Sequence, residues 1–407
     1  MAVVRPQNCR ARTFGNLRSG GDATGVPGGP LKEHSIRKGF KRVVSGALAR
    51  LCRRRPVTPQ ELFADPPRRI LVVRQHNQMG DMVCATPALR ALRRAFPRAE
   101  IVLVCAPVNR DVVLHNPDLD RVLVFDKRAC TRPAPLLRFV GELRRFRPDA
   151  AFVLNSVSYS VTSAALAAAS GAPLLIGGDS LPYGYDISRH AYSLVMPSRP
   201  ELDRHAVDHN LAPLEAIGIV AEDRRTVVVP SAAEEAAAHG IDDLVPGAGG
   251  LWILHPGAGK TQNRWPASRF AEVAARAVRE GRRVLVLQGP ADGPALADFT
   301  SATAGLLAPL GLAPPPLNPP VTVGVCAALL ARAERFLCND TGLMHVAGAV
   351  GTPTLALFGP TDPDLWGPQA PEVVCLRGTQ GRLEALDTDT VWDRWRHLPP
   401  RTGPTRG

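Results

Sequence analysis

Residues 69–97 read RILVVRQHNQMGDMVCATPALRALRRAFP. They open with an apolar run, Ile70–Val73, pass through a polar turn that contains Gly80, and end in a helical pattern over Ala88–Phe96 that Pro97 terminates. The same order recurs, with apolar runs at residues 101–104, 121–125 and 151–154 and helical patterns at 136–146 and 163–170. This alternation of strands and helices predicts a parallel sheet that is covered by helices on both faces.

A second series of the same kind begins at residue 251, after a helical pattern and a glycine-rich linker within residues 231–250. Its strands are expected at residues 251–254, 284–287, 336–338 and 354–357, with helices at 267–280 and after Gly342. The sequence therefore predicts an α/β protein with two Rossmann-like domains, whose parallel sheets face a central cleft. We expect the domains at residues 69–245 and 246–375, a loop at 308–320 and a C-terminal tail at 376–407.

Length and composition agree with a folded protein of two domains. The chain has 407 residues, of which 45% are hydrophobic and 21% are charged. No apolar run reaches the roughly 20 residues that span a bilayer, and no apolar segment of a secretory signal follows Arg5, so we expect a cytoplasmic protein. The eight cysteines are scattered without a C-x-x-C pair, which favours buried reduced thiols over disulfides or a zinc site.

The basic character of the chain is confined to its beginning. The net charge is +12, and residues 1–69 account for +11 of it, with 15 Lys/Arg and 4 Asp/Glu. We expect residues 1–68 to form a partly disordered extension with a basic amphipathic helix at 35–55. This helix could lie on the anionic cytoplasmic face of the inner membrane, or it could dock on the protein body or remain solvated. Nucleic-acid binding is not expected, since aromatic residues for base stacking are nearly absent there.

Three polar segments follow predicted strands. The first, residues 74–81, places Asp81 at the carboxyl edge of the first sheet, either as a functional carboxylate or as a helix cap. The second, His255-Pro256-Gly257-Ala258-Gly259-Lys260, precedes Asn263-Arg264-Trp265-Pro266. Its glycines would let the backbone approach phosphates, whose charge Lys260 and Arg264 can offset, although an ordinary loop is the simpler explanation of this segment by itself.

The third segment is Asn339-Asp340-Thr341-Gly342-Leu343-Met344-His345, followed by Gly351-Thr352-Pro353 and Phe358-Gly359-Pro360. A helix that begins near Thr341 would direct backbone N–H groups at a diphosphate, with His345 in its first turn. Asp340 could also be the N-cap of this helix, and both interpretations can hold together.

Taken together, these motifs resemble those of glycosyltransferase family 9, the heptosyltransferases of the lipopolysaccharide inner core. The resemblance rests on Met79-Gly80-Asp81 with Thr86-Pro87-Ala88-Leu89, on the second segment through Arg264-Trp265-Pro266, and on Asp340–His345 through Pro360. It covers about residues 69–370. Each motif alone is modest, but three in order and after strands are specific.

The resemblance implies a GT-B fold and a role for each matching residue. It implies that Asp81 is the general base and that Asp340, Thr341 and Gly342 bind the donor diphosphate, with His345 nearby. It further implies that Asp292 contacts the ribose. Gly80, Gly257, Lys260 and Arg264 are the other expected donor-binding residues. Many family members carry a lysine where this chain has Asn263, so phosphate neutralisation is expected to pass to Arg264 or Lys260.

We therefore expect an inverting glycosyltransferase that moves a heptose-like sugar from a nucleotide diphosphate donor, with ADP-heptose as the expected donor, to a lipopolysaccharide-core or related glycan acceptor. No cofactor or metal is expected, since no acidic D-x-D motif occurs where the donor would bind and Asp362-x-Asp364 is more simply a turn. Two alternatives stay open at this point. The chain could use another nucleotide sugar, or it could bind a nucleotide sugar without catalysis.

Overall fold

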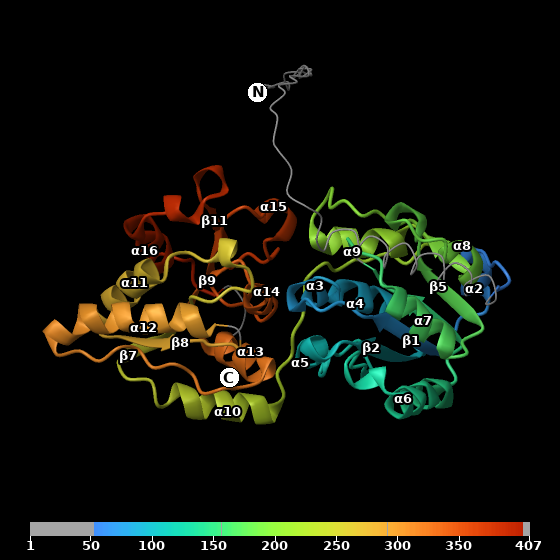
Figure 1. Ribbon diagram of the computed structural model, residues 1–407, viewed down its shortest axis with the longest axis horizontal. Coiled ribbons are helices and arrows are strands. Elements are labelled where there is room, and N and C mark those ends of the chain that lie inside the picture. The colour runs from blue at the N-terminus through green and yellow to red at the C-terminus, as the bar shows by residue number, and fades with distance from the viewer. Residues whose placement is uncertain (1–52, 156, 291, 402–407) are drawn as a thin grey trace, which may run out of the picture.

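The computed structural model describes residues 53–155, 157–290 and 292–401, which form two α/β halves that lie side by side (Figure 1). The helix expected at residues 35–55 falls almost wholly outside the described residues. Within the described ranges, no helix is both long and apolar enough to cross a membrane.

The first half is built on a six-stranded parallel sheet, sheet 1, with strand order β3-β2-β1-β4-β5-β6. Its central strand β1 is buried from Ile70 to Arg74, because a parallel strand inside the sheet is covered on both faces. The direction of strand addition reverses between β1 and β4, and open parallel sheets bind their ligands beyond the carboxyl ends of the strands at such a point. The strands of sheet 1 are β1 (Arg69–Arg74), β2 (Glu100–Cys105), β3 (Arg121–Val124), β4 (Ala150–Val153), β5 (Leu174–Gly178) and β6 (Leu194–Met196).

Helices cover both faces of this sheet (Figure 1). They are α2 (Pro59–Ala64), α3 (Met79–Val83), α4 (Thr86–Ala95), α5 (Arg110–Val113), α6 (Pro133–Phe146), α7 (Val161–Ala169), α8 (Ser188–Ala191) and α9 (Ala206–Glu215).

The second half contains a five-stranded parallel sheet, sheet 2, with strand order β11-β10-β9-β7-β8. Its reversal point lies between β7 and β9, so the loops after these two strands occupy the place where such sheets bind ligands. The strands are β7 (Ala248–His255), β8 (Arg282–Val286), β9 (Arg335–Asn339), β10 (Thr354–Phe358) and β11 (Val373–Arg377). The helices are α10 (Ala232–Asp242), α11 (Ala267–Arg279), α12 (Gly293–Leu307), α13 (Val323–Arg332), α14 (Gly342–Ala349), α15 (Pro363–Trp366) and α16 (Thr388–Arg396).

Helix α16 lies in the segment that was expected to be a C-terminal tail. Its sequence is mostly polar, but Val391, Trp392 and Trp395 are buried on one face. Trp395 meets the ring of Trp252 from β7 edge-on, with 4.8 Å between ring centroids. The helix therefore completes the apolar core on one face of sheet 2.

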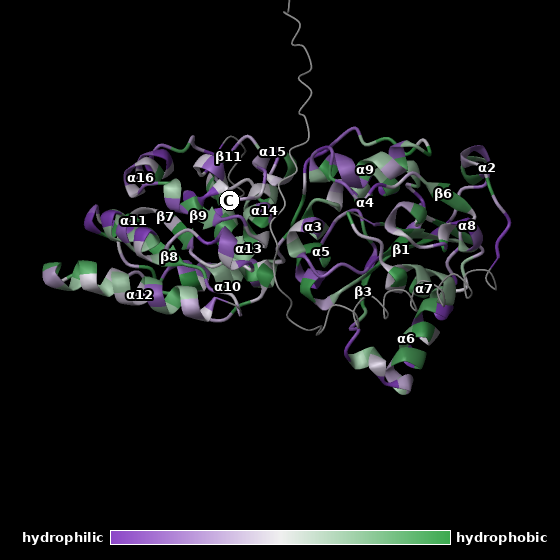
Figure 2. Ribbon diagram, turned by 45° about the horizontal axis from the view of Figure 1, so that its top comes forward, coloured by the Kyte–Doolittle hydropathy of each residue, from purple (hydrophilic) through white to green (hydrophobic). Residues whose placement is uncertain are grey.

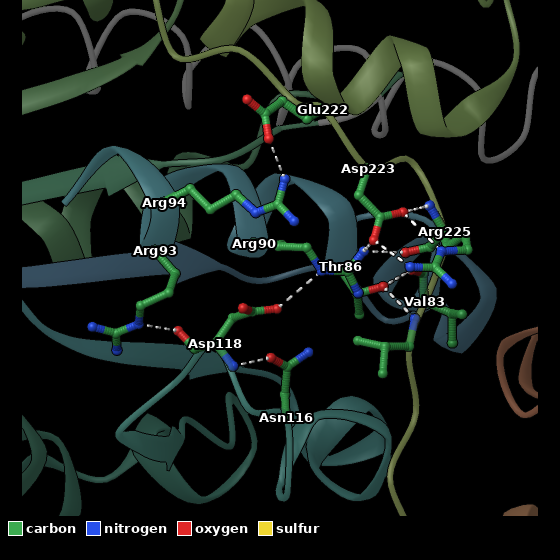
Figure 3. Close-up of polar contacts among 11 residues, drawn as sticks. Val83, Thr86, Arg90, Arg93, Arg94, Asn116, Asp118, Glu222, Asp223 and Arg225 are labelled. Atoms are coloured by element: carbon green, nitrogen blue, oxygen red, sulfur yellow. Dashed lines mark hydrogen bonds and ion pairs between the residues drawn. The ribbon is translucent and has the colours of Figure 1, made fainter. Parts of the chain in front are cut away.

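The chain crosses between the halves after α9, and this crossing is fastened to α4 (Figure 3). Arg90 Nη1 lies 2.9 Å from Asp223 Oδ2, and the Val227 amide donates to Thr86 Oγ1 over 3.0 Å. Hydrogen bonds from Arg225 lower the pKa of Asp223 to about 2, with a further contribution from the charge of Arg90. Helix α10 then packs against α13 of the second half, although the proposed domain boundary at residues 245 and 246 follows it in sequence.

Candidate functional site

Asp81 lies in the first turn of α3, directly beyond the carboxyl end of β1. The N-cap of α3 is Gln78, and no side chain caps this helix. The interpretation of Asp81 as a helix cap is therefore wrong. Its side chain is buried, with 7% of the residue exposed, so another reason is needed for a carboxylate at this place.

A buried arginine lies beside Asp81. Arg74, the last residue of β1, is 1% exposed, and its Nη2 donates to the backbone carbonyl of Asp81 over 3.1 Å. Its Nε and Nη1 are buried without a hydrogen-bond partner among the described residues. An uncompensated buried guanidinium is costly, and the negative charge of Asp81 partly offsets that cost. Arg74 had no predicted role, although a charged residue at the end of an apolar strand was a usable signal.

Burial raises the pKa of the Asp81 carboxyl above its ordinary value, while the charges of Arg74 and of His209 on α9 oppose the rise. A raised pKa brings a carboxylate closer to neutral pH, where a general base works best. Asp81 is thus suited to accept a proton.

Across from α3, helix α14 begins directly after β9. Its N-cap is Thr341, so the interpretation of Asp340 as the cap is wrong. The Oγ1 atom of Thr341 is buried and has no hydrogen-bond partner within the described part of the chain. Since the first N–H groups of a helix also have no partner inside the helix, this end of α14 presents several hydrogen-bond donors together.

Asp340 is held by its neighbours. It accepts a hydrogen bond from Asn263 Nδ2 over 2.8 Å. Burial raises the pKa of Asp340, while a hydrogen bond from Thr361 and the charge of Lys260 partly counteract this rise. Asn263, which stands where many family members have a lysine, thus orients Asp340 instead of supplying a charge.

The starts of α3 and α14 meet closely, and two glycines make this possible. A Cβ atom on Gly80 would lie 2.6 Å from Cδ2 of His345. A Cβ atom on Gly342 would lie 3.2 Å from Cβ of Met79 and 3.6 Å from the amide nitrogen of Gly80. The turn that carries Asp81 therefore lies directly against the helix end that carries Thr341.

His345 is part of this contact and not an exposed donor. Its Nδ1 lies 3.5 Å from Sγ of Cys84, and burial, with the nearby charge of His205, lowers its pKa to about 4. The imidazole is therefore neutral at pH 7. His205 adds a second link between the halves, since its Nε2 lies 2.7 Å from the Gly367 carbonyl while its Nδ1 accepts from the Val207 amide.

The glycine-rich loop after β7 reaches the same region. Asn339, the last residue of β9, fixes this loop by donating to the Pro256 carbonyl over 2.9 Å and accepting from the Trp265 amide over 2.9 Å. Lys260 is exposed. The Nε atom of Arg264 donates to the Ala258 carbonyl over 2.9 Å, and its two terminal nitrogens take no part in this hydrogen bond.

The Asp292 carboxylate is hydrogen-bonded to other residues of the second half. Its Oδ2 lies 2.9 Å from Nε2 of His255 and accepts from the Gly289 amide over 2.7 Å. Burial alone would raise the pKa of Asp292, but the hydrogen bond and charge of His255, the hydrogen bond from the Gly289 amide and the charge of Arg264 together lower it. A side chain on Gly257 would collide with the Asp292 carboxylate. The expected ribose contact would therefore have to be made by a carboxylate that is only 5% exposed.

The structure thus brings together the segments of Asp81, Asp340, Thr341, Gly342 and His345. It places Asp292 and Gly257 together at the neighbouring loops of sheet 2. Cys84, His205 and His209 also contribute here without having been predicted: Cys84 ends α3, beside the motif of Asp81, whereas His205 and His209 belong to α9, which carried no motif.

Comparison with known proteins gives matches over most of the chain. The family model described as Glycosyltransferase family 9 (heptosyltransferase) matches residues 136–395. Lipopolysaccharide heptosyltransferase 1 of Pseudomonas aeruginosa is 28% identical over 316 residues, which cover 74% of this chain and 81% of that protein.

Two solved structures share the fold. The family 9 glycosyl transferase of Veillonella parvula superposes with a TM-score of 0.67 at 23% identity, covering 80% of this chain and 95% of that one. Escherichia coli ADP-heptose lps heptosyltransferase II also superposes with a TM-score of 0.67, at 22% identity, covering 81% of this chain and 98% of that one. These similarities confirm the expected GT-B fold.

Proposed function

Because the chain belongs to glycosyltransferase family 9, and is therefore a glycosyltransferase, we propose that it transfers a heptose-like sugar from ADP-heptose to a lipopolysaccharide-core or related glycan acceptor. The names of the Pseudomonas aeruginosa and Escherichia coli relatives support this choice of donor and acceptor. We further propose that transfer inverts the anomeric configuration, needs no metal ion, and takes place in the cytoplasm at the inner membrane.

One observation carries the proposal. The turn that bears Asp81 and the helix end that bears Thr341 and Gly342 lie in contact, although they belong to opposite halves. A base and a diphosphate-binding helix end are the two parts that inverting transfer requires on either side of the anomeric carbon.

In the proposed reaction, the Asp81 carboxylate takes the proton from the acceptor hydroxyl. The hydroxyl oxygen then forms a bond to the anomeric carbon from the face opposite the diphosphate, and the bond from that carbon to the diphosphate oxygen breaks. The N–H groups at the start of α14, together with Lys260 and Arg264, would stabilise the charge that develops on the departing diphosphate. Since only 7% of Asp81 is exposed, we propose that α3 and α14 separate to admit the substrates and close again around them for transfer.

The test is a transfer assay with ADP-heptose and a lipopolysaccharide-core acceptor. Asp81→Ala should lower kcat by about 10³-fold, as expected for loss of a general base, while nucleotide affinity stays nearly unchanged. Asp298→Ala, which alters an exposed residue on α12, is the matched control. Unchanged turnover in Asp81→Ala would remove the base assignment, and absence of transfer by the unmodified protein would favour the non-catalytic alternative.

Two further measurements address the other parts of the proposal. Thermal stabilisation by a panel of nucleotide sugars tests the donor, since the preferred one should raise Tm most. Transfer in the presence of EDTA tests metal independence. A rate that EDTA abolishes and a divalent cation restores would contradict it.

A further inference from the structure

An exposed surface at the beginning of α6 combines cations with apolar side chains. Residues 126–138 contain four Lys/Arg and a single acidic residue, Asp126. Leu137 is 69% exposed and Leu136 is 37% exposed. We call this the basic apolar surface and define it by six exposed residues, Lys127, Arg128, Arg132, Leu136, Leu137 and Arg138.

The helix itself does not need these leucines for its core. Phe139, Leu143 and Phe146 form the buried stripe of α6 at spacings of four and three residues. Leu137 lies outside this stripe, and α6 stands out from the first half (Figure 2). Exposed leucines that are ringed by cations are typical of surfaces that bind other structures.

The position of this surface relates it to the candidate site. The loop at residues 125–132 follows the carboxyl end of β3, which is the same edge of sheet 1 that carries Asp81 after β1. The charge of Lys127 also acts on His76, in the loop after β1, and contributes to the lowering of its pKa to about 3, for which burial is the main cause. The basic apolar surface therefore lies at the edge of sheet 1 that carries Asp81.

We propose that the basic apolar surface docks on an anionic lipid bilayer, with Leu136 and Leu137 entering the headgroup region and the four cations facing anionic headgroups. Charge complementarity selects this occupant, because an excess of Lys/Arg around a small apolar group matches an anionic membrane. Docking through this surface brings the carboxyl edge of sheet 1 to the bilayer. The role of this docked orientation rests on the proposed function, since it would present a lipid-linked acceptor to Asp81. The docking itself is independent of the proposed function.

The first experiment measures sedimentation of the full chain with vesicles. Vesicles of equal parts phosphatidylcholine and phosphatidylglycerol should bind the protein, and binding should weaken with salt and with pure phosphatidylcholine. Leu137→Glu should reduce the partition coefficient about 10-fold, because it removes a leucine that would be buried among the headgroups and adds a negative charge that the anionic bilayer repels. The double change Arg128→Gln and Arg132→Gln should reduce it about as much and weaken the dependence on salt.

Matched controls change similar residues on the other half. Leu244→Glu alters a leucine that is 83% exposed beyond α10, and Arg394→Gln removes an exposed cation on α16. Each control changes the net charge by one unit at a distance from the bilayer, so each should lower the partition coefficient by no more than about twofold. Equal losses in the controls and in Leu137→Glu, or wild-type binding by Leu137→Glu, would overturn the proposal.

A second experiment separates docking from catalysis. Leu137→Glu should lower kcat/KM about 10-fold with acceptor embedded in anionic vesicles and leave it unchanged with a soluble, delipidated acceptor. An equal loss on both acceptors would show that the change harms the catalytic site and would overturn the docking role. Should the protein transfer no sugar at all, the proposed function fails while the sedimentation result still decides the docking.

Discussion

Gly80→Ala tests whether the contact between α3 and α14 is the working geometry of the site. The added Cβ would lie 2.6 Å from Cδ2 and 3.1 Å from Nε2 of His345. The imidazole is a rigid ring and is 5% exposed, so it cannot turn away as a flexible side chain would. Restoring ordinary contact at 3.4 Å requires the two helix starts to separate by about 0.8 Å.

A separation of this size has a larger effect on catalysis than on stability. Misplacement of reacting groups by about 1 Å can cost about 10²-fold in rate, so kcat/KM should fall by ~10- to 100-fold. The free energy of unfolding should change by less than about 2 kcal/mol, because alanine favours the helix by about 1 kcal/mol and offsets part of the overpacking.

The assay pairs steady-state transfer kinetics with urea unfolding of the same protein. Gly305→Ala is the control, since it lies inside α12 with nothing within 4 Å of the added Cβ. It should stabilise the protein by about 1 kcal/mol and leave kcat/KM unchanged. A Gly80→Ala variant with wild-type kcat/KM would refute the view that the closely packed helix starts are the catalytic arrangement.

Two further predictions concern the charges around this contact. Arg74→Gln should move the acid limb of the kcat/KM profile to higher pH, because losing the nearby positive charge lets burial raise the pKa of Asp81 further. Arg74→Lys, which keeps the charge, should move the limb less. An acid limb that does not move in Arg74→Gln would contradict the role of this arginine. For His345, the folded-state pKa of about 4 lies below the ordinary 6.5, so its contribution to stability is present above pH 6.5 and is lost as the pH falls toward 4, by about 3 kcal/mol. Urea unfolding at pH 7 and pH 4 should show this loss in the unmodified protein and a smaller one in His345→Gln, whereas equal losses would count against a buried neutral imidazole.

The sequence was sufficient for the architecture wherever a strand was a continuous apolar run. The runs at residues 70–73 and 251–254 lie within β1 and β7, the strands beside the two reversal points. Strand β5 contains two glycines, and β6 has only three residues, so neither has a pattern strong enough to predict. Helix α16 was missed because its apolar residues are few and mostly tryptophans, whose burial depends on β7 and α11.

The candidate site was accessible to sequence reasoning only in part. Motifs located Asp81 and the Asp340–Gly342 turn because each segment directly follows a strand beside the reversal point of its own sheet, β1 in sheet 1 and β9 in sheet 2. The roles of Arg74 and His209 could not be read from spacing, since they arise from burial and from the packing of α9 against α4, which brings the charge of His209 near Asp81. The same holds for Asp292, whose pairing with His255 over 37 residues is a tertiary contact.

The most direct measurement is a crystal structure of the protein with a non-transferable ADP-heptose analogue. We predict that the diphosphate oxygens lie about 3 Å from the first amide nitrogens of α14, with the Asp81 carboxylate on the opposite side of the anomeric carbon. A diphosphate bound away from α14, or an anomeric carbon that Asp81 cannot reach through an acceptor hydroxyl, would contradict it.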